Sequence, residues 1–175
     1  IYKMGAGVLP MAFYKEKFYF LFSREWINSK EDGGLWSDFG GSKDNNENFK
    51  ETAIRECNEE SNKILGSKKR IEYLVNKSIK TITINGYRTY IVLIDFDINL
   101  PKKFRNQFLK VKKNNPDLIN KNNGLYEKDM IKWMSYNDIK NNKNIMFRKW
   151  YKKFIKELLK IFLLIKFLYP PAKPP

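Results

Sequence analysis

Three glutamates within one short segment are the grouping in this chain of 175 residues most able to do chemistry. Glu56, Glu59 and Glu60 are spaced i, i+3 and i+4, so a helix would project all three from one face. Like charges at this spacing repel one another and destabilise a helix. Clustered carboxylate oxygens suit hard divalent cations such as Mg²⁺ or Mn²⁺. The spacing therefore predicts a metal site, and the alternative is a solvated acidic helix face.

Composition narrows the chemistry that these glutamates could serve. The chain has no histidine, which excludes catalytic triads, general bases and metal ligands that use imidazole. A single cysteine allows no intramolecular disulfide, which favours a reducing, intracellular compartment. Catalysis would have to use carboxylates, lysine, tyrosine or a metal ion.

The glutamates belong to a longer pattern of fixed spacing. Its members are Gly41, Glu47, Arg55, Glu56, Glu59 and Glu60. Five residues separate the first two members, and seven separate the second from the third. This pattern resembles the signature of the Nudix hydrolases, which cleave a nucleoside diphosphate from another group. The resemblance implies an α/β/α sandwich with a mixed β-sheet, in which a loop-helix-loop motif carries the catalytic residues.

The resemblance also implies roles for individual residues. The three glutamates match the family's metal ligands, and the backbone carbonyl of Gly40 matches an additional ligand. Gly41 is expected to be structural, and Glu47 and Arg55 match a salt bridge that holds the loop against the helix. The family often adds an acid from outside the motif as a base or ligand. Glu127 is our candidate for that acid, with Asp129 as the alternative.

The chain departs from the family pattern just after the paired glutamates. Asn62 stands where the family usually has glycine, and Lys63 stands where it has an aliphatic residue. Asparagine tolerates the left-handed backbone of a helix end, so we expect Asn62 to take the glycine's place. We expect Ile64 and Leu65 to supply the apolar contact one position later.

Apolar patterning predicts a single domain over residues 1–169, with a disordered proline-rich tail over 170–175. The first residue is Ile, so we expect an N-terminal piece to be missing. Pro10 indicates that the first strand lies at an edge or carries a bulge. The expected strands are 4–13, 17–24, 35–39, a hairpin of 70–84 and 87–97 joined by Asn85-Gly86, and 130–134. The expected helices are the motif helix, 102–113 and 147–168.

The net charge of +15 predicts a polyanionic partner. The alternative is that part of this charge reflects a composition rich in Lys and Asn. On the helix over 102–113 the basic side chains form either an RNA-binding strip or an ordinary surface. They are Lys102, Lys103, Arg105, Lys110, Lys112 and Lys113. Lys160 and Lys166 interrupt the apolar C-terminal segment, so no transmembrane segment is predicted. We expect that segment to pack on the core, with association at a membrane surface as the alternative.

A looser resemblance addresses the substrate. The motif region and residues 125–139 are similar to the mRNA-decapping Nudix enzymes of large cytoplasmic DNA viruses. This resemblance implies release of methylated GDP from capped mRNA, in the cytoplasm or with a virion, without DNA specificity. Tyr87 and Tyr90 are the candidates for stacking on the cap base. Other aromatic residues considered by type are Tyr14, Phe20, Trp26 and Tyr126.

Two other functions stay open at this point. One is a small-substrate Nudix hydrolase acting on dinucleoside polyphosphates or diphosphoinositol polyphosphates, which would also favour a basic surface. The other is an RNA-binding protein of the same fold without catalysis. A binding module has no reason to keep three mutually repelling carboxylates, so the sequence favours an enzyme.

Overall fold

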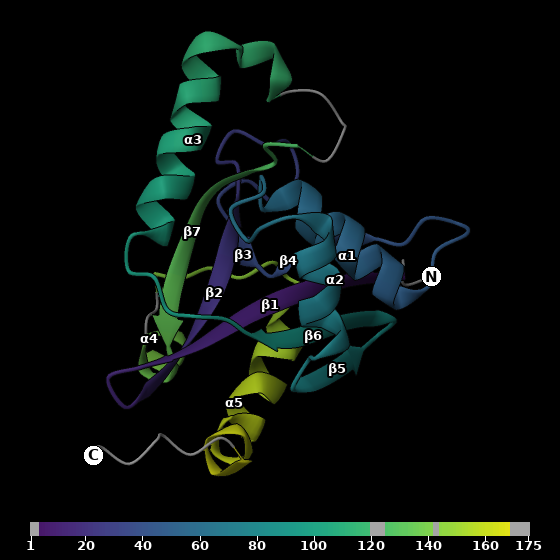
Figure 1. The fold of residues 1–175 in the computed structure, drawn as a ribbon, viewed down its shortest axis with the longest axis vertical. Helices are drawn as coiled ribbons and strands as arrows, with labels where there is room; N and C mark the ends of the chain where they lie inside the picture. The colour runs from purple at the N-terminus through teal and green to yellow at the C-terminus, as the bar shows by residue number, and fades with distance from the viewer. Residues whose placement is uncertain (1–3, 120–124, 142–143, 169–175) are drawn as a thin grey trace.

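A mixed β-sheet forms the centre of the computed structural model, which describes residues 4–119, 125–141 and 144–168 (Figure 1). The order of hydrogen-bonded strands is β3-β2-β1-β6-β5, with β4 paired to β1 and β7 paired to β2. The strands are β1 (Gly5–Tyr14), β2 (Lys17–Glu25), β3 (Trp36–Ser37), β4 (Phe39–Ser42), β5 (Lys80–Ile84), β6 (Tyr87–Leu93) and β7 (Lys128–Ser135).

Strand β1 is the central strand, which corrects the expectation from Pro10. On one side β1 pairs in parallel with β6 over Gly5 to Met11. On the other side it pairs with β4 as far as Val8, and with β2 from Met11 onward. Pro10 lies between these two partners, at the point where the ladder on that side is interrupted. A residue without an N–H is tolerated there because no regular ladder bond is lost.

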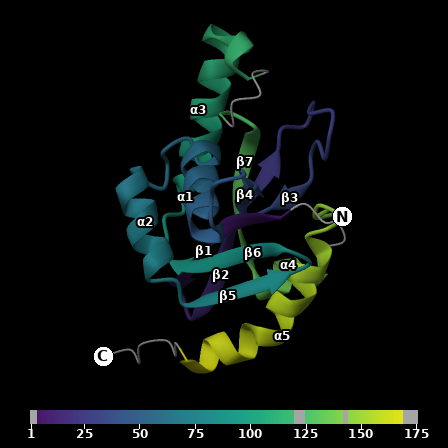
Figure 2. The same cartoon turned by 90° about the vertical axis from the view of Figure 1, so that its right-hand side faces the viewer.

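Helices cover both faces of the sheet (Figures 1 and 2). One hydrophobic core joins the sheet to α1, α2 and α3, and a second joins the opposite face to α4 and α5. The helices are α1 (Phe49–Glu60), α2 (Lys68–Asn76), α3 (Leu100–Asn114), α4 (Tyr136–Asn141) and α5 (Lys152–Leu168). The expected α/β/α sandwich with a mixed sheet is therefore confirmed.

Period-two alternation in β1 explains how one strand serves both cores. Ala6, Val8 and Ala12 point into the first core, whereas Leu9 and Met11 point into the second. All five side chains are buried. A strand buried on both faces has the nearly continuous apolar sequence that residues 4–13 show.

Part of the predicted hairpin is a helix. Residues 68–76 form α2, because Ser67 caps its first turn by accepting a hydrogen bond from the backbone N–H of Arg70. Ile71 and Val75, spaced i and i+4, are the buried residues of this helix. The hairpin itself is shorter and consists of β5 and β6 around Asn85-Gly86. The prediction of a strand over residues 70–76 is wrong, because their buried apolar residues repeat with the period of a helix.

The C-terminal helix also differs from its expected bounds. It begins at Lys152, because Phe147 forms a parallel bridge with Trp36, and the backbone N–H of Arg148 donates to the Trp36 carbonyl at 3.0 Å. Phe154 and Leu158 then pack into the second core, as expected. None of the described helices has the length and apolarity to cross a bilayer. The expected tail over 170–175 lies outside the described residues.

Candidate functional site

The start of α1 is fixed by a reciprocal capping interaction. Asn48 Oδ1 accepts hydrogen bonds from the backbone N–H groups of Lys50 and Glu51, at 2.9 and 3.0 Å. The Glu51 carboxylate accepts one in return from the backbone N–H of Asn48, at 2.8 Å. Ala53, Ile54 and Cys57 then face the core, which leaves another face of the helix for the glutamates.

The end of α1 has the expected left-handed backbone. Asn62 has a φ of 49°, and Lys63 follows with a φ of 64°. Leu65 is buried in the first core and Ile64 packs against it, so the apolar contact falls one position late, as expected. Asn62 also ties the motif to distant segments. Its backbone carbonyl accepts a hydrogen bond from Gln107 Nε2 at 3.2 Å, and its Oδ1 accepts one from the Tyr126 N–H at 3.4 Å.

Arg55 binds the loop and the helix together. Its Nε and Nη2 donate to the two carboxylate oxygens of Glu47, at 2.7 and 2.9 Å. This fork-to-fork ion pair is the one expected from the motif. The Arg55 guanidinium holds the pKa of Glu47 down at about 2. Arg55 Nη1 also lies 2.8 Å from Glu56 and 3.3 Å from Glu59, so one cation partly neutralises three carboxylates.

Gly40 and Gly41 permit a close approach between strand β4 and the glutamates. A Cβ atom on Gly41 would lie 2.6 Å from a carboxylate oxygen of Glu56. A Cβ atom on Gly40 would collide with the backbone of Ala6 and Gly7 in β1. Only glycine fits at position 40, whereas a side chain at position 41 would displace the Glu56 carboxylate.

Glu60 is the most deeply placed of the three glutamates, with 2% of its surface exposed. One carboxylate oxygen accepts a hydrogen bond from the Gly40 N–H at 2.6 Å. The other lies 3.0 Å from the ammonium of Lys128 on β7. Burial raises the pKa of Glu60 well above its ordinary value, and the Lys128 charge opposes this shift.

Lys128 connects Glu60 to a second buried carboxylate. Its Nζ donates to Glu25 at 2.6 Å, and the lysine side chain is fully buried. Burial alone would lower the Lys128 pKa, but the charges of Glu60 and Glu25 outweigh that effect and raise it. Arg148 lies beyond, with Nη1 3.9 Å from Glu25 and Nε 2.7 Å from Asp32. We call Glu25, Glu60 and Lys128 the buried ion-pair triad.

Neither Lys128 nor Glu25 is predicted as a site residue from the sequence. Lys128 is one of 34 lysines and arginines, and nothing in its local pattern separates it from the exposed ones. Its role follows from the pairing of β7 with β2, in which Lys128 lies opposite Glu25. That register joins residues 103 positions apart.

The structure brings Glu127 into the electrostatic environment of the motif. Burial raises its pKa, and the negative charges of Glu25 and Glu59 raise it further, against the opposing charges of Lys128 and Arg148. Burial likewise raises the pKa of Glu56, against the opposing charge of Arg55, and the charges of Glu59 and Glu127 add to the rise. Glu127 therefore lies within electrostatic range of Glu56 and Glu59, and its role at the site stays a prediction.

Asp129, the alternative acid, has another role. Arg24 donates to both of its carboxylate oxygens at 2.9 Å, and Arg105 Nη1 lies 3.4 Å from one of them. The Asp129 side chain is 1% exposed. These contacts tie β2, β7 and α3 together and leave no carboxylate oxygen of Asp129 free for the site.

The oxygen atoms of the site have the right chemistry to bind a divalent cation. Their present arrangement is not that of a metal site. Over residues 4–119, 125–141 and 144–168, no three acidic or cysteine side chains are arranged to hold a metal ion as they stand. Arg55 and Lys128 account for this, because they engage Glu56, Glu59 and Glu60. The donors are nevertheless all oxygen, and burial raises the pKa of Glu56 and Glu127, with the crowding of negative charge adding to the rise. A hard divalent cation would relieve that crowding.

Both tyrosines proposed for stacking on the cap base are structural. Tyr90 is 6% exposed and lies in the first core. The Tyr87 hydroxyl donates to Asp38 at 2.9 Å, and its ring packs on Trp150 with centroids 4.4 Å apart. Asp38 also accepts from Thr89 at 2.8 Å, and burial raises its pKa to about 6. Tyr90 is therefore unavailable for stacking, and Tyr87 is held by Asp38 and Trp150.

Two of the other aromatic candidates lie next to Glu127 along the backbone. The backbone N–H of Trp26 donates to the Glu127 carbonyl at 2.8 Å, and Tyr126 is the residue before Glu127. Both side chains are half-buried. Phe20 is fully buried, and Tyr14 stacks on Phe96 with centroids 4.3 Å apart. Trp26 and Tyr126 are therefore the candidates that the geometry retains.

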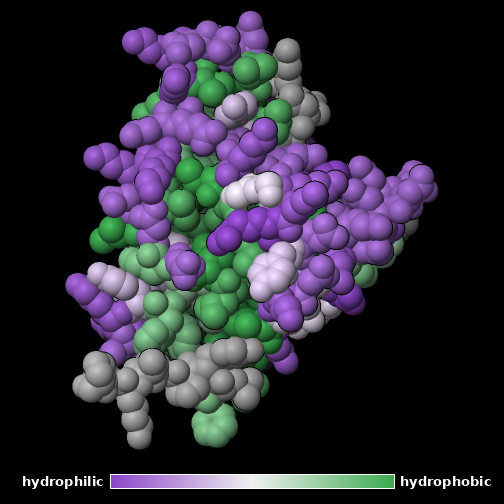
Figure 3. Space-filling model, in the orientation of Figure 1, coloured by the Kyte–Doolittle hydropathy of each residue, from purple (hydrophilic) through white to green (hydrophobic). Residues whose placement is uncertain are grey.

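The basic side chains of α3 divide into two groups. Arg105 is half-buried, and its Nη1 donates to the Asp129 carbonyl at 2.9 Å. Lys103 pairs with Asp97 at 2.7 Å. The remaining lysines of the predicted strip are exposed, and they are Lys102, Lys110, Lys112 and Lys113. Hydrophilic side chains cover α3 in the upper left of Figure 3.

Comparison with known proteins identifies the fold. No protein-family model matches the chain, and no curated protein matches it in sequence. Among solved structures, an Ap4A hydrolase of C. elegans in a binary complex is similar, with a TM-score of 0.52 and 17% identity, over 95% of this chain and 99% of that one. The Nudix hydrolase RenU of M. smegmatis has a TM-score of 0.51 and 14% identity, over 93% of this chain and 88% of that one.

A third similar structure is the Nudix domain of Shewanella oneidensis NrtR, complexed with ADP ribose. Its TM-score is 0.51 and its identity 11%, over 93% of this chain and 89% of that one. Identities this low establish the architecture and leave the chemistry to the residues of the site. From the sheet, the two helical layers and these neighbours, the chain has the fold of the Nudix hydrolases.

Proposed function

We propose that this chain is a divalent-metal-dependent hydrolase of pyrophosphate linkages, and that its substrate is the 5′ cap of mRNA. The observation that carries the proposal is the pairing of Glu56 and Glu59 on a helix capped and braced as the motif requires, with Glu127 before β7 within their electrostatic range. Such a constellation is costly without a cation, so its presence argues for catalysis rather than binding alone.

The chemical problem is to bring water onto a phosphorus atom already surrounded by negative oxygens. A bound divalent cation supplies charge neutralisation and a more acidic water. In this chain Glu56, Glu59 and Glu60 would hold that cation, with the carbonyl of Gly40 as the additional ligand that the motif implies. Arg55 sets the angle of Glu56 and Glu59, because its Nη1 contacts both carboxylates.

Glu127 is the residue that we assign as the base. Burial and neighbouring negative charges raise its pKa, so its carboxylate accepts a proton more readily than an exposed glutamate does. A proton taken from the attacking water would rest on that carboxylate until product leaves. Glu60 is not assigned as the base, because its two carboxylate oxygens already contact Lys128 and the Gly40 N–H.

Three features support capped RNA as the substrate. The net charge of +15 favours a partner with many phosphates, and Lys102, Lys110, Lys112 and Lys113 expose charge along α3. Trp26 and Tyr126 offer aromatic surface next to Glu127 for a methylated, positively charged guanine. Residues 125–139 resemble viral decapping enzymes, whose substrate is cytoplasmic.

A second candidate substrate is a dinucleoside polyphosphate. The similarity in fold to a C. elegans Ap4A hydrolase over 95% of this chain favours it. A small polyanion would need no long basic surface. We would then expect uncapped RNA not to inhibit its hydrolysis.

The test is hydrolysis of cap-labelled RNA in Mg²⁺ or Mn²⁺, with uncapped RNA and free cap analogue as competitors. We expect release of methylated GDP that RNA inhibits and cap analogue scarcely affects. The inactive control is Glu59→Gln, and the matched active control is Glu72→Gln, at an exposed glutamate of α2. Hydrolysis of dinucleoside polyphosphates without release from RNA would refute decapping. Absence of both activities would refute the hydrolase.

A further inference from the structure

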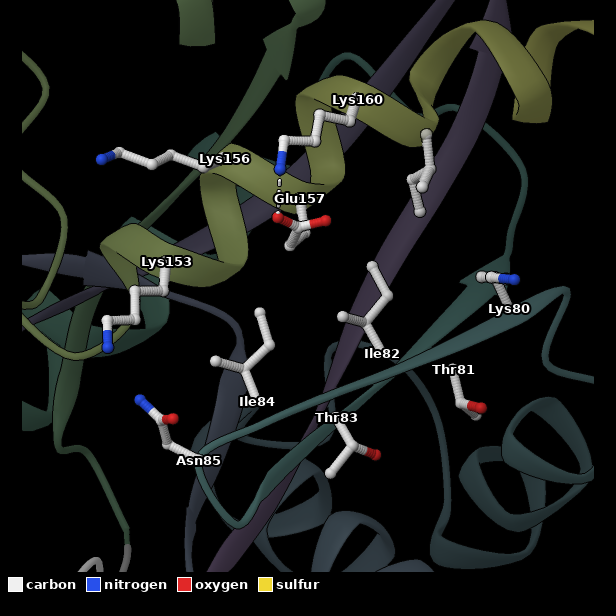
Figure 4. Close-up of a pocket in the computed structure, with 11 residues that line it drawn as sticks. Lys80, Thr81, Ile82, Thr83, Ile84, Asn85, Lys153, Lys156, Glu157 and Lys160 are labelled. Atoms are coloured by element: carbon white, nitrogen blue, oxygen red, sulfur yellow. Dashed lines mark hydrogen bonds and ion pairs between the residues drawn. The ribbon is translucent and has the colours of Figure 1, made fainter.

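A groove of about 710 Å³ lies between the edge strand β5 and helix α5 (Figure 4). Its lining residues are Lys80, Thr81, Ile82, Thr83, Ile84, Asn85, Lys153, Lys156, Glu157, Lys160 and Ile161. We call it the β5–α5 groove. It lies on the sheet face that carries α5, opposite the face on which α1 packs, and none of the proposed catalytic residues lines it.

The groove is strongly basic. Four lysines line it against one glutamate. Lys160 is paired with Glu157 at 2.6 Å, in a contact whose side chains are 70% and 43% exposed. The other three, Lys80, Lys153 and Lys156, take part in no ion pair with the residues that the structure describes, so they leave a net positive charge. Lys153, Lys156 and Lys160 follow one face of α5 at spacings of three and four.

The shape of the groove fits an extended chain. β5 is the outermost strand of its side of the sheet, so one of its edges is open. Its five residues extend about 17 Å, which sets the length of this wall. In Figure 4, Ile82 and Ile84 point from β5 toward α5 and form an apolar floor beneath the lysines. No aromatic side chain is among the lining residues. A nucleic acid bound here would be held by its phosphates, without stacking of its bases.

One end of the groove lies close to the proposed catalytic site. Asn85 is next to Gly86, whose carbonyl accepts a hydrogen bond from the Gly5 N–H at 3.2 Å. Gly5 pairs with Ser42 on β4, adjacent to Gly41. The path from β6 across β1 to β4 covers two strand spacings, or about 10 Å. A polymer whose first phosphates are held at the glutamates would pass around this end of the sheet to reach the groove on the opposite face.

Protection of the open edge of β5 is a simpler role for lysines. Charged side chains on an edge strand prevent pairing with another chain. That role accounts for Lys80, which lies on β5 itself. It does not account for Lys153 and Lys156, which lie on a helix across the groove.

From these observations we propose that the β5–α5 groove binds the phosphate backbone of the RNA body downstream of the cap. The inference rests on the proposed decapping function for the identity of the polymer. It adds a binding surface separate from α3 and predicts recognition that is independent of base sequence. It also gives the enzyme a way to prefer capped RNA over free cap analogue.

The test is RNA binding by a triple variant, Lys80→Gln, Lys153→Gln and Lys156→Gln, over a range of salt concentrations. The matched control is Lys63→Gln, Lys68→Gln and Lys69→Gln, which removes equal charge from exposed positions outside the groove. The probe is a fluorescent uncapped RNA of mixed sequence. Each phosphate contact to a single strand contributes about 0.7 to the salt slope, so three contacts lower it by about 2. Each tenfold fall in salt then widens the affinity gap from wild type about 100-fold.

The outcomes separate this inference from the function on which it rests. An unchanged salt slope in the groove variant, or an equal loss in the control variant, would overturn the groove whatever the decapping result. Loss of RNA binding in the groove variant, with no hydrolysis of capped RNA by the wild type, would support the groove and refute decapping. If the groove variant loses binding to inositol hexakisphosphate but binds RNA as the wild type does, RNA is not the occupant of the groove.

A second variant guards against misfolding of the first. Lys156→Glu changes one exposed residue and places a negative charge in the groove. We expect its melting temperature to equal that of the wild type and its RNA affinity to fall at low salt. Equal RNA affinity at low salt would contradict the proposal.

Discussion

The buried ion-pair triad makes a sharp prediction for the substitution Lys128→Met. Methionine keeps the approximate length and apolar stem of lysine but removes the charge that lies 2.6 Å from Glu25 and 3.0 Å from Glu60. The lysine is fully buried, so neither carboxylate gains solvent in exchange. Removing one partner of a buried pair costs about 3–5 kcal/mol. In a chain of this size that corresponds to a melting temperature lower by about 6–20 °C.

A divalent cation should reverse much of this loss. Without Lys128, Glu60 has an oxygen available for a metal ion, and the site loses one of its compensating positive charges. A ligand present at about 100 times its Kd stabilises the folded state by about 2.7 kcal/mol. We therefore expect Mn²⁺ to raise the melting temperature of Lys128→Met more than that of the wild type.

The assay is thermal unfolding with and without Mn²⁺, followed by circular dichroism. The matched control is Lys132→Met, the same substitution at an exposed position of the same strand, which should leave the melting temperature close to that of the wild type. If Lys128→Met unfolds at the same temperature as Lys132→Met, the triad does not stabilise the fold. If Mn²⁺ shifts the wild type and Lys128→Met equally, Lys128 does not compete with the metal.

Three other predictions concern the motif and its support. Glu59→Gln and Glu60→Gln should each lower turnover about 100-fold or more while the circular dichroism spectrum persists, and retained turnover in both would contradict the site. Gly41→Ala should also remove activity from a folded protein, because its Cβ would meet the Glu56 carboxylate at 2.6 Å, and full activity would refute that contact. Burial raises the pKa of Asp38 from 3.8 to about 6, so the folded state binds its proton more tightly than the unfolded state does. The free energy of unfolding should therefore fall by up to about 3 kcal/mol between pH 4 and 7, and urea titrations of Asp38→Asn should lack this decrease.

Local patterns predicted the motif well because its determinants are local. Asn62, two residues after the last motif glutamate, has the positive φ expected of it, and Arg55 pairs with Glu47 only eight positions away. Such interactions depend on helix spacing and on backbone preferences that a short segment already contains. Glu127 could not be proposed from local patterns, because its position depends on the loop before β7. It was proposed from the resemblance to the Nudix hydrolases.

Features that depend on tertiary pairing could not be predicted in the same way. Lys128 and Glu25 meet only through the register of β7 on β2. Tyr90 looked available for stacking by residue type, yet it is buried because β6 is an inner strand of the sheet. Residues 70–77 carry β-branched and aromatic side chains but form the end of a capped helix, since packing of Ile71 and Val75 outweighs strand propensity.

The central place of β1 has a consequence for the order in which the protein folds. β1 begins at Gly5, and Gly5 pairs with Tyr87, 82 positions away along the chain. Closing so long a loop costs entropy before the contact returns any stability, so this ladder should form slowly. Strand β4, which carries Gly40 and Gly41, pairs with β1 alone. Because Lys128 on β7 holds Glu60, the glutamate site can acquire its final geometry during synthesis only after both β6 and β7 have left the ribosome.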